Sequence, residues 1–260
     1  MIKKGLLIVS FGTSYRDTEL KCIAPIEDAA KEVFKDFEVR RAYTSKMIIK
    51  KLAKEGKIIP TPEEAVKKMA DEGFTHLIVQ SLHFMKGHEY HKKIIEPLRL
   101  YKDSFKGFAI GEPLLSSDND FDQVVDVVGD LSGSVNGEPL LLMGHGTDHP
   151  SDSVYSTLQK RLDVAEINAK IATVEGSIDL YNILPDLLNE GTKQVHLFPL
   201  MLVAGDHARN DMAGDDDSWK KILEWKGIST FPHLQGMGEY MKIRQIFIRH
   251  IGSCKKELFP

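Results

Sequence analysis

The chain contains an internal repeat, because two segments of its first half reappear in the same order in its second half. Residues 6–14 align with residues 140–148, and residues 77–89 align with residues 195–207. Each aligned segment begins with an apolar run and continues into a turn that contains glycine. Two matches in the same order indicate that one supersecondary unit has been duplicated. The sequence therefore predicts two similar lobes.

Within each half, short apolar runs alternate with segments of helical periodicity. Short apolar runs that end at glycine or a polar turn are typical of buried parallel strands. The strands are expected at 6–9, 37–43, 77–82, 108–110, 140–143, 170–174, 195–203 and 229–231. Thr61, followed by proline and two glutamates, is a clear helix start. The pattern predicts an α/β fold with two similar lobes, each a parallel sheet flanked by helices, and a cleft between them.

The linker between the lobes is expected at residues 132–137, which are rich in serine and glycine. This boundary gives an N-terminal lobe of residues 1–133 and a C-terminal lobe of residues 134–260. A chain of 260 residues is long enough for two domains of ordinary size.

Composition and charge exclude several classes of protein. The net charge is −4 and no basic stripe carries interleaved aromatics, so no nucleic-acid partner is expected. No apolar stretch approaches the ~18 residues of a membrane span. Cys22 and Cys254 match no disulfide framework and no metal-binding pair. A soluble cytoplasmic protein is expected.

Three candidate metal ligands follow three strands of the second half. His145 comes after the strand at 140–143, Glu175 after the strand at 170–174, and His207 after the strand at 195–203. Parallel strands bring their carboxyl ends to one edge of a sheet, where ligands bind. Two imidazoles and a carboxylate suit a divalent first-row ion and leave coordination positions open. These three residues are the predicted metal site.

The first half lacks part of this set. Phe11 stands at the position of His145, so a single metal centre is expected, with Phe11 packed near the substrate. Glu89 stands at the position of His207, and His83 follows the strand at 77–82. For Glu89 and His83 the residues alone leave a functional and a structural role open. No P-loop, dinucleotide-binding glycine motif or nucleophile elbow is present.

Several of these segments together resemble the anaerobic sirohydrochlorin cobaltochelatases of the CbiK type, within the class of chelatases that includes ferrochelatase. The segments that carry the resemblance are 7–14 (LIVSFGTS), 44–49 (TSKMII), 80–83 (QSLH), 143–146 (MGHG), 199–208 (PLMLVAGDHA), 210–212 (NDM) and 217–219 (DSW). The resemblance spans nearly the whole chain, and the run at 199–208 is its most specific part.

The resemblance implies insertion of Co²⁺ into sirohydrochlorin in cobalamin biosynthesis, with no nucleotide and no cofactor beyond the substrate ion. It implies that His145 is both metal ligand and catalytic base and that Glu175 and His207 complete the metal site. Glu89 is also expected to be catalytic, because it stands at the position of His207 in the internal repeat. The residues expected to contact the macrocycle are Ser10, Phe11, Gly12, Thr13, His83 and Leu202. By position, Arg40, Arg41, Lys46 and Arg209 are candidates for binding its carboxylates.

Two alternatives stay open at this point. A chelatase of the same fold acting on Ni²⁺ or Fe²⁺ would use the same ligand types, because such a site does not choose sharply among these ions. A two-lobed carrier of metal or tetrapyrrole would need no base beside the ion. The expected partners are a tetrapyrrole and a divalent metal, and the sequence leaves a homo-oligomer open.

Overall fold

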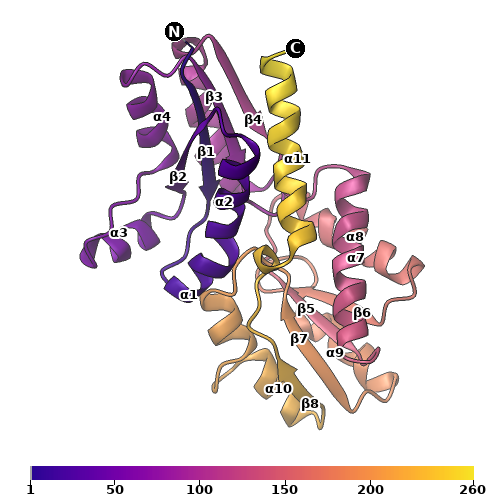
Figure 1. The fold of residues 1–260 in the computed structure, drawn as a ribbon. Helices are drawn as coiled ribbons and strands as arrows, with labels where there is room; N and C mark the ends of the chain where they lie inside the picture. Colours follow the sequence, from indigo (N-terminus) through magenta and orange to yellow (C-terminus); the bar gives the residue numbers. More distant parts are fainter. Residues whose placement is uncertain (1) are drawn as a thin grey trace. The chain divides into compact units, whose positions relative to one another are not determined.

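The computed structural model describes residues 2–260, and these residues form two compact units. The first unit comprises the chain up to Ser116 together with Ile243–Pro260, and the second comprises Ser117–Lys242. Each unit contains a four-stranded parallel sheet with helices packed against it (Figure 1). The predicted α/β fold with two similar lobes is confirmed.

In the first unit the strand order is β2-β1-β3-β4. The strands are β1 (Lys4–Ser10), β2 (Glu38–Tyr43), β3 (His76–Ser81) and β4 (Gly107–Gly111). The helical segments are α1 (Arg16–Thr18), η1 (Glu19–Ile23), α2 (Ala24–Val33), α3 (Lys46–Lys54), α4 (Pro62–Asp71), α5 (His88–Tyr90), η2 (His91–Ile95), α6 (Glu96–Leu98), η3 (Arg99–Ser104) and α11 (Met241–Leu258). The predicted start of α4 is confirmed, because Thr61 and Glu64 form a capping box there.

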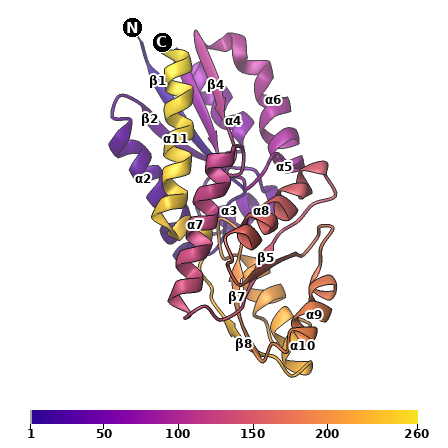
Figure 2. The ribbon, with the colours of Figure 1, turned by 90° about the vertical axis from the view of Figure 1, so that its right-hand side faces the viewer.

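The two faces of this sheet bury alternate residues of each strand, as the two-residue period of a strand requires. Leu7 and Val9 of β1 pack with residues of α4 and η2 in one apolar cluster. Leu6 and Ile8 are buried on the opposite face. Figure 2 shows α2 and α11 on one side of the sheet and α4 and α6 on the other. Both faces are covered, which is why the strands read as unbroken apolar runs.

The boundary between the units differs from the one expected at residues 133 and 134. Ser117 caps a new helix, α7 (Asp118–Ser134), and the serine and glycine of the expected linker lie in its last turn. Helix α7 buries an apolar stripe that includes Val124, Val128 and Leu131. The helix groups with the second unit, where it contacts a later helix of that unit (Ser153–Val164), so its polar C-terminal turn is part of that unit.

The C-terminal helix also differs from the expected arrangement, because α11 belongs mainly to the first unit. It buries Ile243, Ile246, Phe247, Ile251 and Cys254. The ring of Phe259, just beyond the helix, packs edge-on against Phe37 and tilts over His76. The apolar stripe of α11 thus completes the core of the lobe that began with β1.

The second unit repeats the strand order of the first, as β6-β5-β7-β8. Its strands are β5 (Leu140–Gly144), β6 (Ala169–Thr173), β7 (Gln194–Pro199) and β8 (Ser229–Pro232). Its other helical segments are η4 (Pro150–Asp152), α8 (Ser153–Val164), α9 (Leu180–Asn189), η5 (His207–Met212), α10 (Trp219–Trp225) and η6 (Met237–Glu239). Strand β7 ends at Pro199, four residues earlier than the apolar run suggested, because a turn follows this proline.

The strand order places a topological switch point in each sheet. Successive connections run to opposite sides of β1 in the first unit and of β5 in the second. Ligands of open α/β sheets bind at the carboxyl ends of the strands beside such a point. The loops after β1 and β3, and after β5 and β7, are therefore the places to look for function. Among residues 2–260, no helix combines the length and the apolar character that crossing a membrane requires.

Candidate functional site

His145 directly follows β5 in the second unit. Its Nδ1 lies 2.8 Å from the carbonyl oxygen of Gly146. Because a carbonyl oxygen only accepts hydrogen bonds, Nδ1 carries the hydrogen, and Nε2 keeps its lone pair. This hydrogen bond fixes the ring orientation in the way that metal-binding histidines are usually fixed. Nε2 of His145 is therefore the atom available to bind an ion or accept a proton.

The loops after β5 and β6 are held in close contact by their backbones. The amide of Glu175 donates to the carbonyl oxygen of His145, at 2.8 Å. Gly146 has a φ of +78°, and a Cβ at this position would lie 2.2 Å from the amide nitrogen of Gly176. Only glycine accommodates both the left-handed backbone and this close approach. The spacing between His145 and Glu175 is thus set by the backbone.

Asp152 joins the same two loops through its side chain. One carboxylate oxygen accepts from the amide of Thr147 at 3.0 Å, beside His145. The other accepts from the amide and the hydroxyl of Ser177, at 2.8 and 2.7 Å, beside Glu175. A carboxylate that bridges two loops in this way restricts how far they can separate. Asp152 was not among the residues predicted from the sequence, since its partners are known only once the loops are placed.

His207 begins η5, a π-helical segment that follows β7. Its ring centroid lies 4.8 Å from that of His145, with the two rings nearly perpendicular. Its Nδ1 lies 2.5 Å from Oδ2 of Asp211, four residues later. The carboxylate holds the hydrogen on Nδ1 and directs the Nε2 lone pair outward. Asp211 was also missed from the sequence, although the i,i+4 spacing of a histidine and an aspartate was a usable signal.

Glu175 completes the predicted metal set, and its side chain lies near His145 at the surface. Its side chain is 61% exposed, and its Oε2 lies 4.0 Å from Nδ1 of His145. Bonds from such ligands to a metal are about 2.0–2.2 Å long. Across residues 2–260, no three His, Cys, Asp or Glu side chains are arranged to hold an ion as they stand. His145, Glu175 and His207 share one neighbourhood, and their role as metal ligands stays a prediction.

In the first unit, the last residue of β1 and the loop that follows it supply four of the predicted substrate contacts. Gly12 has a φ of +96°, and a Cβ there would lie 2.5 Å from the ring of Tyr43. The backbone turn leaves the side chain of Phe11 44% exposed, while Ser10 and Thr13 are buried. The hydroxyl of Ser10 is buried without a hydrogen-bond partner within residues 2–260. An exposed aromatic ring beside an unsatisfied hydroxyl is an arrangement that a flat, polar ligand could complete.

Three further predicted residues lie after β3 and β7. Glu89 lies in α5, and its Oε2 is buried without a partner among the described residues. His83 lies between Ser81, whose Oγ is 3.0 Å from Nδ1, and Thr44, whose Oγ1 is 3.4 Å from Nε2. Leu202 is half-buried in the turn after β7 of the second unit. An orphaned carboxylate oxygen is rare in native proteins, which makes Glu89 a candidate for function.

Comparison with known proteins identifies the family of this chain. A model of the family described as "Cobalt chelatase (CbiK)" matches residues 4–256. The chain belongs to the cobalt chelatase family. It is 41% identical to the sirohydrochlorin cobaltochelatase of Salmonella typhimurium over 96% of both chains. It is 36% identical to the sirohydrochlorin cobaltochelatase CbiKC of Nitratidesulfovibrio vulgaris, over 99% of this chain and 93% of the relative.

Solved structures of chelatases share the fold of this chain. SirB from Bacillus subtilis, determined with Fe³⁺, superposes with a TM-score of 0.65 at 12% sequence identity, covering 97% of this chain and 96% of SirB. CbiX, described as the terminal enzyme of sirohaem biosynthesis in denitrifying bacteria, superposes with a TM-score of 0.57 at 14% identity, covering 96% and 99% of the two chains. At these identities the likeness concerns the fold alone.

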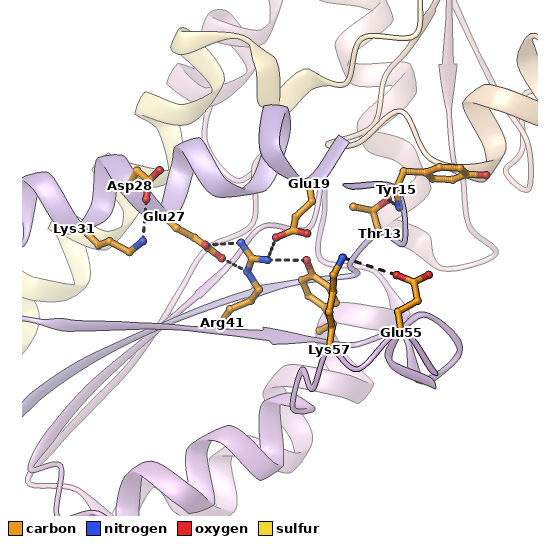
Figure 3. A network of polar contacts seen from close by, with 10 residues as sticks. Thr13, Tyr15, Glu19, Glu27, Asp28, Lys31, Arg41, Glu55 and Lys57 are labelled. Carbon is orange, nitrogen blue, oxygen red and sulfur yellow. Dashed lines mark hydrogen bonds and ion pairs between the residues drawn. The ribbon is translucent and has the colours of Figure 1, made fainter. Parts of the chain in front are cut away.

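The basic residues predicted to bind substrate carboxylates differ in whether carboxylates of the chain already pair with them. Figure 3 shows the guanidinium of Arg41 between Glu27 and Glu19, and it donates to Glu27 at 2.6 and 2.7 Å. Arg40 pairs with Glu38 and Glu72. Both arginines are thus neutralised by carboxylates of the same unit, which argues against the candidacy of either. Their pairing leaves Lys46 as the exposed candidate of this unit.

His83 is expected to make the stability of the folded chain depend on pH. Desolvation lowers the pKa of His83 to about 4, below the 6.5 of an ordinary histidine. The unfolded chain therefore binds a proton that the folded chain does not, and stability falls as the pH drops from about 6.5 towards 4. The expected loss from this residue is at most about 3 kcal/mol.

The measurement is urea unfolding of the wild type and of His83→Asn at pH 7.5 and pH 4.5. The wild type is expected to lose more free energy of unfolding between the two pH values than the variant does. The difference isolates His83 from the carboxylates that titrate in both proteins. Equal losses in the two proteins would show that His83 does not supply this dependence.

Proposed function

We propose that this chain inserts Co²⁺ into sirohydrochlorin, as a step of cobalamin biosynthesis, and that it needs no nucleotide to do so. The proposal rests chiefly on the match to the cobalt chelatase family, which runs from residue 4 to residue 256 and so includes every predicted site residue. The geometry around Nε2 of His145 supports it, because the single lone pair of that atom can bind the ion first and accept a proton once the ion has passed to the macrocycle.

The reaction exchanges two protons for one divalent ion. Two pyrrole N–H bonds of the macrocycle break, and their electron pairs become ligands of Co²⁺. The two protons pass to bases or to water. An ion that is to be handed over must be bound by ligands that also release it. Imidazole and carboxylate ligands suit this requirement better than thiolates, which bind such ions more tightly.

In the second unit, we assign His145 the double role of metal ligand and base. His207, oriented by Asp211, and Glu175 would complete the ion's ligands. The exposed Glu175 side chain can rotate toward the ion without disturbing the core. Asp152 would keep the two loops at the separation that ion binding needs. Each of these groups lies at the strand edge where an open α/β sheet binds its ligands.

In the first unit, we assign Glu89 the role of accepting the second pyrrole proton. Residues 10–13 are assigned to contact the macrocycle. A carboxylate that lacks a hydrogen-bond partner in the free protein is suited to accept one from a ligand. The exposed ring of Phe11 offers an apolar surface to a flat macrocycle. Because Phe11 replaces the histidine of the second unit, one cobalt ion per chain is expected.

The test is an anaerobic assay in which sirohydrochlorin is in large excess over the protein and the visible spectrum is followed after Co²⁺ is added. We expect many turnovers per chain, no effect of added ATP, and a slow rate without protein. A spectral change that stops at one equivalent of protein would indicate a carrier and overturn the proposal. Parallel reactions with Ni²⁺ and Fe²⁺ identify the preferred ion, and a higher kcat/KM for either would reassign the substrate metal.

A further inference from the structure

Helix α3 presents an exposed face of lysines at the carboxyl edge of the first sheet. Ser45 caps the helix by accepting from the amide of Ile48, and Ile48 and Leu52 are buried beneath it. The opposite face is exposed and carries Lys46, Met47, Lys50, Lys51 and Lys54, which line a shallow hollow on the surface. The side chain of Met47 is 69% exposed. The face therefore combines several positive charges with an apolar side chain.

None of these four lysines makes an ion pair with any residue in the described part of the chain. Lys51 lies above the ring of Tyr15, at 5.6 Å from its centroid. The contrast within the same unit is clear, because Arg40 and Arg41 are each paired with two carboxylates. Lys46 interacts with the carboxylate of Glu64 strongly enough to help lower its pKa, and the rest of the charge of α3 is left for an external anion.

The arrangement is unfavourable for the helix itself. Lys46 and Lys50, and Lys50 and Lys54, are spaced i,i+4, where like charges repel. Lys46 also lies in the first helical turn, where the helix dipole disfavours a cation. These local penalties would be relieved by an anion bound along the face.

The helix is tied to the loop that we assign to the macrocycle. The amide of Thr44 donates to the carbonyl oxygen of Ser10 at 2.9 Å, and the amide of Ser45 donates to that of Phe11 at 3.2 Å. Lys46 follows Ser45 directly, so the lysine face begins one residue after a backbone hydrogen bond to Phe11. Within this unit, the lysines of α3 are therefore joined through the backbone to the loop that carries Phe11.

We propose that the lysine face of α3 (Lys46, Lys50, Lys51 and Lys54) docks the peripheral carboxylates of the tetrapyrrole, with Met47 against its apolar parts. This inference rests on the proposed function, since sirohydrochlorin is a ring that carries several carboxylates. The face would determine affinity for the substrate and discrimination against rings with fewer carboxylates. It would leave the chemistry at His145 unchanged.

The test compares a triple variant, Lys46→Gln with Lys50→Gln and Lys54→Gln, with a control of equal charge change. The control carries Lys67→Gln, Lys102→Gln and Lys106→Gln, three exposed lysines elsewhere in the same unit. A second variant replaces Lys46, Lys50 and Lys54 by arginine and keeps the charge. Binding of sirohydrochlorin is measured without cobalt, by quenching of protein fluorescence, at low and at high NaCl. The KM values for both substrates are measured in the assay with cobalt.

The glutamine triple variant is expected to bind sirohydrochlorin about tenfold more weakly at low salt, because each exposed ion pair contributes a few-fold at most. Its KM for the tetrapyrrole should rise by the same factor, with kcat and the KM for cobalt unchanged. The control and the arginine variant should match the wild type. High salt should weaken the wild type and leave the triple variant nearly unaffected.

Two results would overturn the proposal. One is that the glutamine triple variant binds sirohydrochlorin with the same affinity as the wild type. The other is a pair of observations: the wild type binds sirohydrochlorin independently of salt, and it binds phosphatidylserine vesicles whereas the glutamine triple variant does not. This pair would assign the lysine face to a membrane surface. If the wild type binds sirohydrochlorin through α3 yet shows no turnover with any ion, the docking face stands and the proposed function fails.

Discussion

Alanine in place of His145 is expected to lower kcat for cobalt insertion by about 10²–10⁴-fold, the usual range when a general base is removed. The variant loses a metal ligand and the proton acceptor at Nε2 together. Its fold should survive, because the side chain is 45% exposed at the end of a strand. The free energy of unfolding should change by no more than about 0.5 kcal/mol, as for most substitutions at exposed sites.

Glu175→Gln is the matched comparison, because the glutamine keeps the shape of a side chain that we expect only to hold the ion. Its KM for cobalt should rise, while kcat at saturating cobalt stays within about tenfold of the wild type. Initial rates over a range of cobalt concentrations separate the two effects. A folded His145→Ala protein with near-normal kcat would refute the assignment, and His207 or His83 would then be the next residue to test as the base.

Alanine at Gly146 is expected to have the second large effect, because the new Cβ has no room. It would lie 2.2 Å from the amide nitrogen of Gly176, so the loops that carry His145 and Glu175 must move apart. A displacement of about 1 Å at reacting groups can reduce a rate about 10²-fold. We expect a fall in kcat of that order and a loss of stability beyond what the backbone conformation alone explains.

Gly73→Ala provides the control for backbone strain. Gly73 has a φ of +77°, almost the same as Gly146, but nothing lies within 4 Å of its Cβ position. The free energy of unfolding of this variant should fall by only about 1–2 kcal/mol, the cost of a side chain on a left-handed backbone. Its kcat should be normal. Urea unfolding and the cobalt assay measure both variants. Equal stability losses and normal rates in both would show that the contact between the loops has no role in the site.

The fold could be predicted from the sequence because its signals are local and repeated. The apolar runs of β1 and β5 are buried on both faces of their sheets, so each reads as a strand without reference to the rest of the chain. The expected boundary was displaced for the opposite reason. The polar end of α7 resembles a linker locally, and only the packing of its apolar stripe shows that it belongs to a helix.

The positions of the candidate residues could be predicted where they follow a strand end, and their contacts could not be predicted where the partners are distant in the sequence. The placement of His145 and Glu175 beside each other follows from the pairing of β5 with β6. Asp152 bridges the loops after both strands, which no pattern of neighbouring residues encodes. The burial of Arg41 between Glu19 and Glu27 is equally non-local, so position alone made it a substrate-binding candidate.

The first unit is discontinuous, since α11 completes it only after the whole of the second unit has intervened in the chain. During synthesis on a ribosome, residues 2–116 emerge early but lack the helix that buries Phe247 and Ile251. At typical elongation rates of about 5–20 residues per second, this lobe waits several seconds with one face of its sheet incompletely covered. The second unit, which is continuous, can close first. We expect the order of folding in the cell to run against the order of the sequence, with the earlier lobe finishing last.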